Sequence, residues 1–290
     1  MPDSSRFTLP AVPAVLLAII SVQGGAAIAK GLFPVLGAAG TTSIRIGLSA
    51  LVLLAVVRPR FSQLQPAQWR AVVPYGLALG AMNFLFYCAL ARIPLGVAVT
   101  LEFVGPLGLA LTGSRRLIDV VWVALAGAGI ALLAPWSGHN IDLLGLGFAL
   151  AAGGCWAGYI VLSQRTAALL PGPVAVTVGM LFATLPVLPF GVASGSLSAL
   201  TPHLLLLGAL LALFSSILPF SLEMQALRTM PTRTFSILMS LEPVVAALSG
   251  WALLGEQLTL GQWLAVVFIV VASAGATATS PRAQPAVGSE

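Results

Sequence analysis

Long runs of apolar residues, broken at short intervals by proline, glycine or charged residues, extend along almost the whole chain. A membrane-spanning helix needs about 20 predominantly apolar residues, within a range of about 17 to 25. Ten segments approach this length: 11–30, 42–57, 72–91, 95–113, 118–135, 143–163, 173–194, 203–226, 233–254 and 260–279. The pattern predicts an all-α polytopic membrane protein with ten transmembrane helices. The first segment is interpreted as a retained span and not as a cleaved signal peptide.

The composition excludes the main alternatives to a membrane protein. The chain of 290 residues carries 13 basic and 8 acidic residues, 7% of the total, and 59% of its residues are hydrophobic. Soluble domains carry about 25% charged residues, so too few charges are present to cover a surface in water. Disordered chains are poor in apolar residues, and the mean hydropathy of +1.04 excludes that class as well.

The positive charges predict how the chain is oriented in the bilayer. With the N-terminus inside, one set of loops and ends collects Arg6, Arg58, Arg60, Arg70, Arg115, Arg116, Arg165, Arg228, Arg233 and Arg282. The opposite side keeps Arg92, with Lys30 and Arg45 near the ends of the first two spans. Cytoplasmic loops are enriched in Lys and Arg, so both termini are predicted to be cytoplasmic. The cations form no run that matches a phosphate lattice, and no nucleic-acid partner is expected.

The second half of the chain repeats features of the first. Pro94 and Pro106 align with Pro231 and Pro243, and Leu117 and Trp122 align with Leu258 and Trp263. These matches divide the chain into two five-span halves, 11–135 and 143–279. An odd number of spans makes the two copies inverted relative to each other, which is typical of secondary transporters. A chance alignment of apolar helices is the alternative.

Three glutamates fall inside predicted spans: Glu102, Glu223 and Glu242. A charged side chain at the bilayer centre costs about 2.5–3.5 kcal/mol on insertion scales, so such residues usually face a bundle interior or a wet cavity and have a function. Glu242 lies roughly 15 Å along its span, near the predicted midplane. Glu223 lies nearer the cytoplasmic end, within reach of Arg228 or Arg233. We expect these carboxylates to bind substrate or to carry protons.

Helix interruptions are predicted beside two of these acids. Gly105 and Pro106 follow Glu102, and Pro243 follows Glu242. Proline removes one helical hydrogen bond and disfavours helical geometry at the preceding residue. Interruptions at matching positions of two halves indicate a substrate site at the midplane. Proline kinks that serve only packing are the alternative.

Several other polar residues are weaker candidates for the same site. Lys30 and Arg45 can bind a substrate carboxylate or extend to the lipid headgroups. Asn83 and Tyr87, four residues apart on one helix face, can line a polar cavity with Gln23 or only bond between helices.

Glycine spacing and the cysteines indicate packing and no chemistry. The pairs Gly76–Gly80 and Gly154–Gly158 predict close helix approach. Cys88 and Cys155 form no Cys-x-x-Cys motif and no Cys/His cluster, so no metal site, disulfide framework or cofactor is expected. Oligomeric state is not indicated by the sequence.

Three stretches, SVQGGAAIAKGLFP, GAMNFLFYCALARIPLGVAVTLEFVGPL and LPFSLEMQALRTMPTRTFSILMSLEPVVAALSG, carry a resemblance to a known family. They resemble the EamA-type branch of the drug/metabolite transporter superfamily, and within it the bacterial exporters of threonine and homoserine. The resemblance covers roughly residues 10–280. It implies ten helices in two inverted five-helix repeats, and efflux of small neutral amino acids across the inner membrane, driven by the proton gradient.

The leading hypothesis is therefore a proton-coupled exporter of small amino acids that works by alternating access. Efflux of another metabolite or drug is the alternative within transport. An intramembrane enzyme is disfavoured because the chain has no HExxH and no GxSxG motif. A purely structural protein would leave the midplane carboxylates without a role.

Overall fold

The computed structural model describes residues 10–111, 117–133, 142–219, 222–223, 226, 230, 235 and 238–279. Within these ranges every regular element is a helix, which confirms the all-α class. The elements are α1 (Ala11–Val57), η1 (Phe61–Gln63), α2 (Pro66–Leu90), α3 (Leu95–Glu102), α4 (Val104–Leu111), α5 (Leu117–Leu133), α6 (Leu143–Leu169), α7 (Gly172–Ala183), α8 (Leu188–Ala193), η2 (Ser196–Ala199), α9 (Pro202–Ala212), η3 (Leu213–Ile217), α12 (Glu242–Leu254) and α13 (Leu260–Thr279).

The lengths and composition of these helices make the protein a multi-pass membrane protein. Among the described residues, five helical segments are long and apolar enough to cross a bilayer, and four shorter apolar helices accompany them. The exact number of spans and the domain boundaries 11–135 and 143–279 stay predictions. Predicted spans 203–226 and 233–254, and the ends of 95–113 and 118–135, extend partly outside the described ranges.

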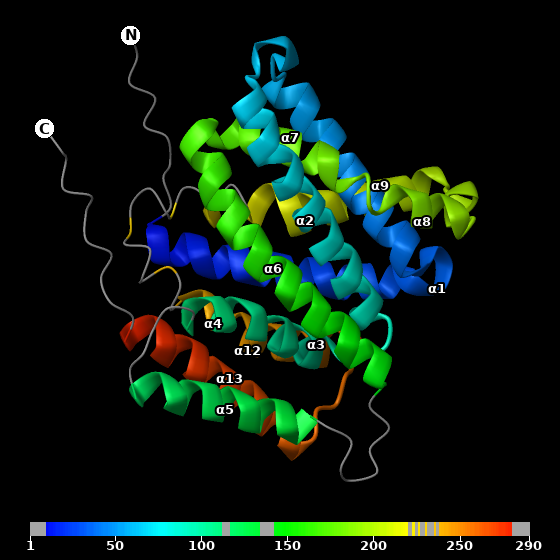
Figure 1. Ribbon diagram of the computed structural model, residues 1–290. Helices are drawn as coiled ribbons and strands as arrows, with labels where there is room; N and C mark the ends of the chain where they lie inside the picture. Colours follow the sequence, from blue (N-terminus) through cyan, green and yellow to red (C-terminus); the bar gives the residue numbers. More distant parts are fainter. Residues whose placement is uncertain are drawn as a thin grey trace, which may run out of the picture.

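The first two predicted spans are two helical halves of α1 joined directly at a kink. α1 has 47 residues and bends at Gly37, whose φ of 63° lies in the left-handed region that glycine adopts readily. At 1.5 Å per residue the 47 residues provide about 70 Å of helix in two pieces, more than twice the thickness of the hydrocarbon core. Figure 1 shows the second half of α1 turning steeply away from the first. The chain therefore changes direction at the non-helical residue Gly37, with helix on both sides of it.

Other predicted spans are interrupted. α3 and α4 are separated by a turn at Phe103, and α7 and α8 by turns over 184–187, a segment that contains Pro186. α9 continues into η3, a π-helical turn. Such π-turns are frequent at functional sites.

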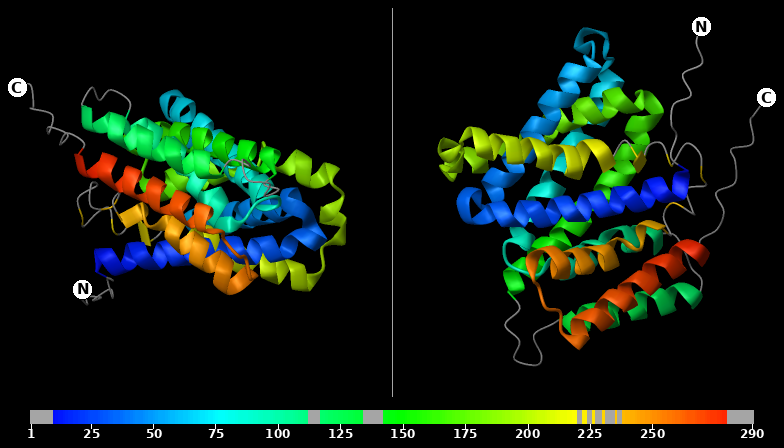
Figure 2. Two further views of the ribbon diagram at one scale, coloured as in Figure 1. Left: turned by 90° about the horizontal axis from the view of Figure 1, so that it is seen from below. Right: turned by 180° about the vertical axis from the view of Figure 1, so that it is seen from behind.

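Helices from the two halves of the chain pair with each other. α5 contacts α13, and α3 contacts α12. Both pairs are antiparallel: the indole Nε1 of Trp122 near the start of α5 donates to Thr279 Oγ1 at the end of α13. In the other pair, Leu95 at the start of α3 lies against Gly250 in the second half of α12, and Gly96 lies against Ala247, nearer the start of α12. Figures 1 and 2 show these pairs as adjacent layers beneath α1, with α2, α6 and α7 on its other side.

Small residues allow several of these close contacts. Gly76 and Gly80 lie against backbone carbonyls of α7, as the sequence predicts. The prediction for Gly154 and Gly158 is wrong, because no atom of the described residues in another helix lies within 4 Å of the position of a Cβ at either residue. The neighbouring Gly153 makes the close approach instead, to the backbone of Glu102 and Gly105.

Three described connections, 91–94, 194–201 and 255–259, gather with the bend at Gly37 at one end of the molecule (Figures 1 and 2). We call this the Gly37 end. The start of α1 and the end of α13 lie at the opposite end.

Candidate functional site

A cavity of about 600 Å³ lies among the helices. Its wall combines polar and charged side chains with aromatic and aliphatic ones from both halves of the chain. The lining residues are Val22, Gln23, Ala26, Arg45, Met82, Asn83, Phe86, Glu102, Phe103, Pro106, Leu107, Leu109, Trp156, Tyr159, Ile160, Ser163, Gln164, Ser215, Glu223, Phe235, Met239, Glu242, Ser273 and Thr277.

The cavity extends toward the end opposite Gly37. Leu109 lies late in α4, Gln164 late in α6 and Thr277 late in α13. α4 and α13 follow connections at the Gly37 end, and the start of α6 is held there by an ion pair between Arg92 and Asp142. The lining residues of all three helices therefore come from their distant halves.

Two glutamates meet at the centre because α3 and α12 are antiparallel. The pairing of Gly96 with Ala247 and of Leu95 with Gly250 brings the end of α3 beside the start of α12. Glu102 is the last residue of α3 and Glu242 is the first of α12. Each is 8% exposed and each lines the cavity.

Glu242 has one hydrogen-bond partner and one free oxygen. Gln23 Nε2, from the first half of α1, donates to Glu242 Oε1 over 3.0 Å. Glu242 Oε2 and Gln23 Oε1 are buried without a hydrogen-bond partner. Buried polar atoms in native proteins are nearly always paired, so this part of the wall has capacity to bind a donor.

Arg45 projects from the second half of α1 into the same cavity. Its Nη1 donates to the Tyr87 hydroxyl over 3.0 Å, its Nη2 to the Ser215 carbonyl over 3.1 Å, and its Nε to the Ser216 hydroxyl over 3.3 Å. The guanidinium carbon also lies 5.2 Å from the centroid of the Tyr87 ring. Three neutral groups from α2 and η3 thus fix the guanidinium.

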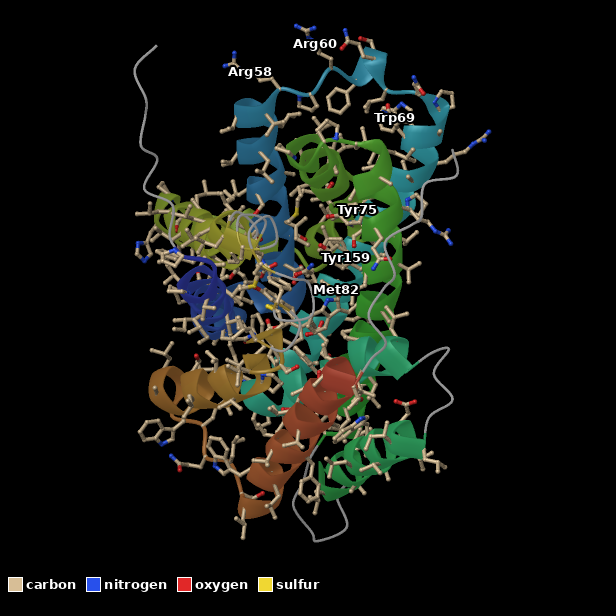
Figure 3. All side chains as sticks on the ribbon, turned by 90° about the vertical axis from the view of Figure 1, so that its left-hand side faces the viewer. Arg58, Arg60, Trp69, Tyr75, Met82 and Tyr159 are labelled. Atoms are coloured by element: carbon tan, nitrogen blue, oxygen red, sulfur yellow. The ribbon has the colours of Figure 1, made fainter. Side chains whose placement is uncertain are left out.

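Aromatic rings, among them Phe103, Trp156 and Tyr159, line another part of the cavity, and Tyr75 packs behind Tyr159. Tyr75 and Tyr159 stack with their centroids 5.1 Å apart, and Figure 3 shows them facing each other with Met82 nearby. Trp156 packs edge-on against Phe103 at 4.9 Å, beside the turn that separates α3 from α4. The cavity therefore has an aromatic side as well as a charged one.

Comparison with known proteins identifies the family. Residues 143–278 match the EamA-like transporter family. The chain is 45% identical over 287 residues to the threonine/homoserine exporter RhtA of Salmonella typhimurium (strain LT2), covering 97% of each chain. The chain belongs to the EamA-like transporter family. It is 45% identical to RhtA of Escherichia coli (strain K12), covering 96% of each chain. Its relatives are named transporters, and it is a transporter and not an enzyme.

More distant matches agree with this family. The transporter YwfM of Bacillus subtilis (strain 168) is 26% identical over 80% of this chain and 81% of its own. One crystal structure superimposes with a TM-score of 0.58 at 20% identity, covering 92% of this chain and 97% of that one. At that identity the match supports the fold alone.

The structure brings most of the candidate residues of this EamA-like transporter to one place. Gln23, Arg45, Asn83, Glu102, Pro106, Glu223 and Glu242 line the cavity. Tyr87 lies behind the wall as a partner of Arg45, while Asn83 Nδ2 donates to the Leu79 carbonyl. Arg228 and Arg233, the predicted partners of Glu223, lie outside the described residues.

The predicted helix-break residues separate into different roles. The interruption near Glu102 falls at Phe103, and Pro106 lies inside α4 on the cavity wall. Gly105 is in contact with Gly153 and does not line the cavity. Pro243 is buried in the first turn of α12, directly after the turn at Leu241.

Lys30 lies apart from the cavity, at the Gly37 end. Its Nζ donates to Glu256 Oε1 over 2.6 Å and to the Ile93 carbonyl over 2.9 Å. Glu256 Oε2 accepts from the backbone N–H of Leu95 over 2.8 Å. We call these four residues the Lys30–Glu256 latch. Sequence reasoning missed Glu256, because it follows Gly255 in a connection and resembles an ordinary exposed acid.

Ser215 was also missed. Its hydroxyl lines the cavity from η3 and is buried without a hydrogen-bond partner, packed against Gly25 of α1. A serine in an apolar run carries no signal that distinguishes this position. Among the described residues, no group of three His, Cys, Asp or Glu side chains can hold a metal ion.

Proposed function

We propose that this transporter exports small neutral amino acids of the threonine and homoserine class. The observation that carries the proposal is 45% identity over 97% of the chain to proteins named threonine/homoserine exporters. Ligand sites typically enclose about 300–1,000 Å³, and the cavity of about 600 Å³ has room for such a molecule. Its acidic and basic side chains suit a zwitterion.

Alternating access is the proposed mechanism. The cavity extends toward the end that carries the start of α1 and the end of α13, and the Lys30–Glu256 latch ties three segments together at the other end. The antiparallel pairs α3–α12 and α5–α13 support two inverted five-helix repeats. In the proposed topology the chain spans the bacterial inner membrane ten times with both termini in the cytoplasm, and the Gly37 end faces outward.

Proton coupling is proposed for Glu102 and Glu242. A carboxylate buried in a membrane protein is accommodated by a proton or by a cationic partner. Both residues border the cavity at the interface of the two halves, where loss or gain of a proton changes the charge that the substrate meets. A ligand shifts a conformational equilibrium only through its differential affinity for the two states, and protonation of these groups provides such a difference.

Release from loaded cells tests the substrate assignment. Cells that lack their own exporters are loaded with a threonine- or homoserine-containing dipeptide, and release of the free amino acid is followed with and without this protein. Faster release with the protein is expected. Equal release would contradict the amino-acid assignment, and drug resistance without release would favour efflux of another compound through the aromatic side of the cavity.

Substitution of the two acids tests proton coupling. Glu242→Gln and Glu102→Gln preserve side-chain shape, and each variant is expected to fail to concentrate labelled threonine in proteoliposomes when a pH gradient is imposed. Glu102→Gln is expected still to exchange it. Asp142→Asn removes a carboxylate outside the cavity and is expected to concentrate threonine normally. If both cavity variants concentrate threonine as the unaltered protein does, neither carboxylate couples protons.

A further inference from the structure

The cavity contains a buried cation that forms no ion pair within 4.0 Å with a carboxylate of the described residues. Arg45 is 7% exposed, and all three of its hydrogen-bond acceptors are neutral. Within the part of the chain that the structure describes, the ion pairs within 4.0 Å are Lys30–Glu256 and Arg92–Asp142. Glu102 lines the same cavity and lies near enough to interact electrostatically with Arg45, but among the described residues no carboxylate accepts a hydrogen bond from the guanidinium. A buried charge is stabilised best when it is directly paired and hydrogen-bonded, so Arg45 can still bind an anion directly.

Comparison with Lys30 shows why Arg45 is the better candidate to bind a substrate carboxylate. Both cations were candidates for a substrate carboxylate, but the Lys30 ammonium is already paired with Glu256 and lies outside the cavity. The Arg45 guanidinium has five N–H groups in a planar fork. Three of them are used, one on each nitrogen, which leaves a second N–H on both Nη1 and Nη2. Two such groups match the two oxygens of a carboxylate.

Hydrogen-bond acceptors without partners lie elsewhere on the wall of the same cavity. Glu242 Oε2 and Gln23 Oε1 are buried acceptors without partners, and both residues line the cavity with Arg45. An ammonium group supplies three donors and needs acceptors of this kind. The cavity thus offers donors at one place and acceptors at another, the arrangement that a zwitterion requires.

We propose that Arg45 binds the α-carboxylate of the substrate, while Glu242 and Gln23 accept hydrogen bonds from its α-ammonium group. Tyr87 and η3 act as positioning groups, because their oxygens hold the guanidinium from behind. This assignment rests on the proposed function, since it takes the substrate to be an amino acid. It adds which side chain recognises which end of the molecule.

Ligand-induced thermal stabilisation of the purified protein in detergent tests the assignment, because a ligand that binds the native state raises Tm according to its affinity. The probes are L-threonine and L-threoninol, which lacks the carboxylate. The unaltered protein is expected to bind threonine at least about tenfold more tightly, as the loss of a charge-assisted hydrogen bond predicts. Arg45→Gln is expected to weaken threonine binding by a similar factor and leave threoninol unchanged. The preference then disappears.

Arg70→Gln is the matched control, since Arg70 is an exposed cation at the start of α2 outside the cavity, and it should keep the preference. An Arg45→Gln protein that unfolds cooperatively and still prefers threonine would overturn the assignment. If that variant does not fold, Tyr87→Phe keeps the ring and removes one acceptor, and an unchanged preference there overturns it equally. Binding of neither probe by the unaltered protein would instead count against the proposed function, and with it the assignment.

Discussion

The role of each charged side chain in this apolar chain depends on the partner that it meets. Lys30 and Arg45 are both cations in α1, yet one is neutralised by Glu256 and the other is held by neutral oxygens. Glu242 keeps a free oxygen toward the cavity. A charged side chain that forms an ion pair stabilises the folded arrangement of the helices. A charged side chain in a cavity without such a partner is available to bind a ligand.

Asp142 illustrates a charge with a structural role. It caps α6 by accepting from the backbone N–H groups of Leu144 and Gly145. The hydrogen bond from the Arg92 guanidinium, with that from Gly145, lowers the pKa of Asp142 below its ordinary value of 3.8. A depressed carboxylate pKa stabilises the folded protein above the unfolded pKa, and the contribution is lost as pH falls through the folded pKa.

We therefore expect Asp142→Asn to lower Tm near neutral pH and to differ less from the unaltered protein as the pH falls through the lowered pKa of Asp142. Asparagine is itself a good helix cap, so Asp142→Ala should lower Tm further. Thermal unfolding in detergent across this pH range measures both. A difference between Asp142→Asn and the unaltered protein that persists undiminished in acid would contradict the assignment.

At the scale of helices, a single atom decides how closely two elements approach. A Cβ on Gly105 would overlap the carbonyl oxygen of Gly153, and a Cβ on Gly153 would approach the carbonyl of Glu102. This contact packs α4 against α6. It therefore helps to position the backbone of Glu102 relative to α6. Gly154, one residue further along α6, faces open space.

Gly105 in the α4–α6 contact and Gly154 on α6 outside it give a matched pair of variants. Gly105→Ala is expected to destabilise the protein by about 1–3 kcal/mol, since backbone must move to admit the methyl group. Gly154→Ala is expected to be neutral or to stabilise by up to about 1 kcal/mol, because alanine is the better helix former. Unfolding of both proteins in detergent gives the comparison, and equal stabilities would show that the contact does not limit packing.

For the molecule as a whole, the Lys30–Glu256 latch connects α1, the connection before α3 and the connection after α12. These segments come from both halves of the chain. Any opening at the Gly37 end has to separate Lys30 from Glu256 and release the Leu95 N–H from the Glu256 carboxylate. The latch therefore contributes to the balance between the two proposed states.

Glu256→Gln is expected to accelerate backbone amide exchange in segments 93–98 and 255–259 by roughly two- to fivefold, the effect of losing one partly exposed ion pair. Hydrogen–deuterium exchange measured by mass spectrometry resolves these segments. Asp142→Asn breaks a different ion pair at the same end and should leave segment 255–259 unchanged. Unaltered exchange in Glu256→Gln would mean that the latch does not hold this end closed.

The sequence predicted the helical class and the residues of the cavity better than their roles. Apolar run length is a local property, so the presence of many apolar helices was predictable, and a buried acid is conspicuous in an apolar segment. The partner of a charge is not local: Lys30 and Glu256 are 226 positions apart. For the same reason, nothing in the chain distinguished Arg45 from Lys30 before their neighbours were known.

The interruptions and the bend were harder to predict for a different reason. Prolines at 106 and 243 marked the correct regions, but the turn near Glu102 falls at Phe103, three residues before its proline. The bend in α1 depends on the conformation of Gly37, one of 30 glycines. Packing selects which glycine adopts the left-handed conformation, and sequence alone does not carry that choice.

The antiparallel pairing of α3 with α12 and of α5 with α13 also constrains how the protein assembles. The chain is synthesised from its N-terminus, so α3 and α5 enter the membrane long before their partners exist. Their packing faces stay uncovered until residues 242–279 have been inserted. A chain that stops before α12 therefore lacks one wall of the cavity. The uncovered faces of α3 and α5 are then the surfaces by which cellular quality control would recognise an incomplete transporter.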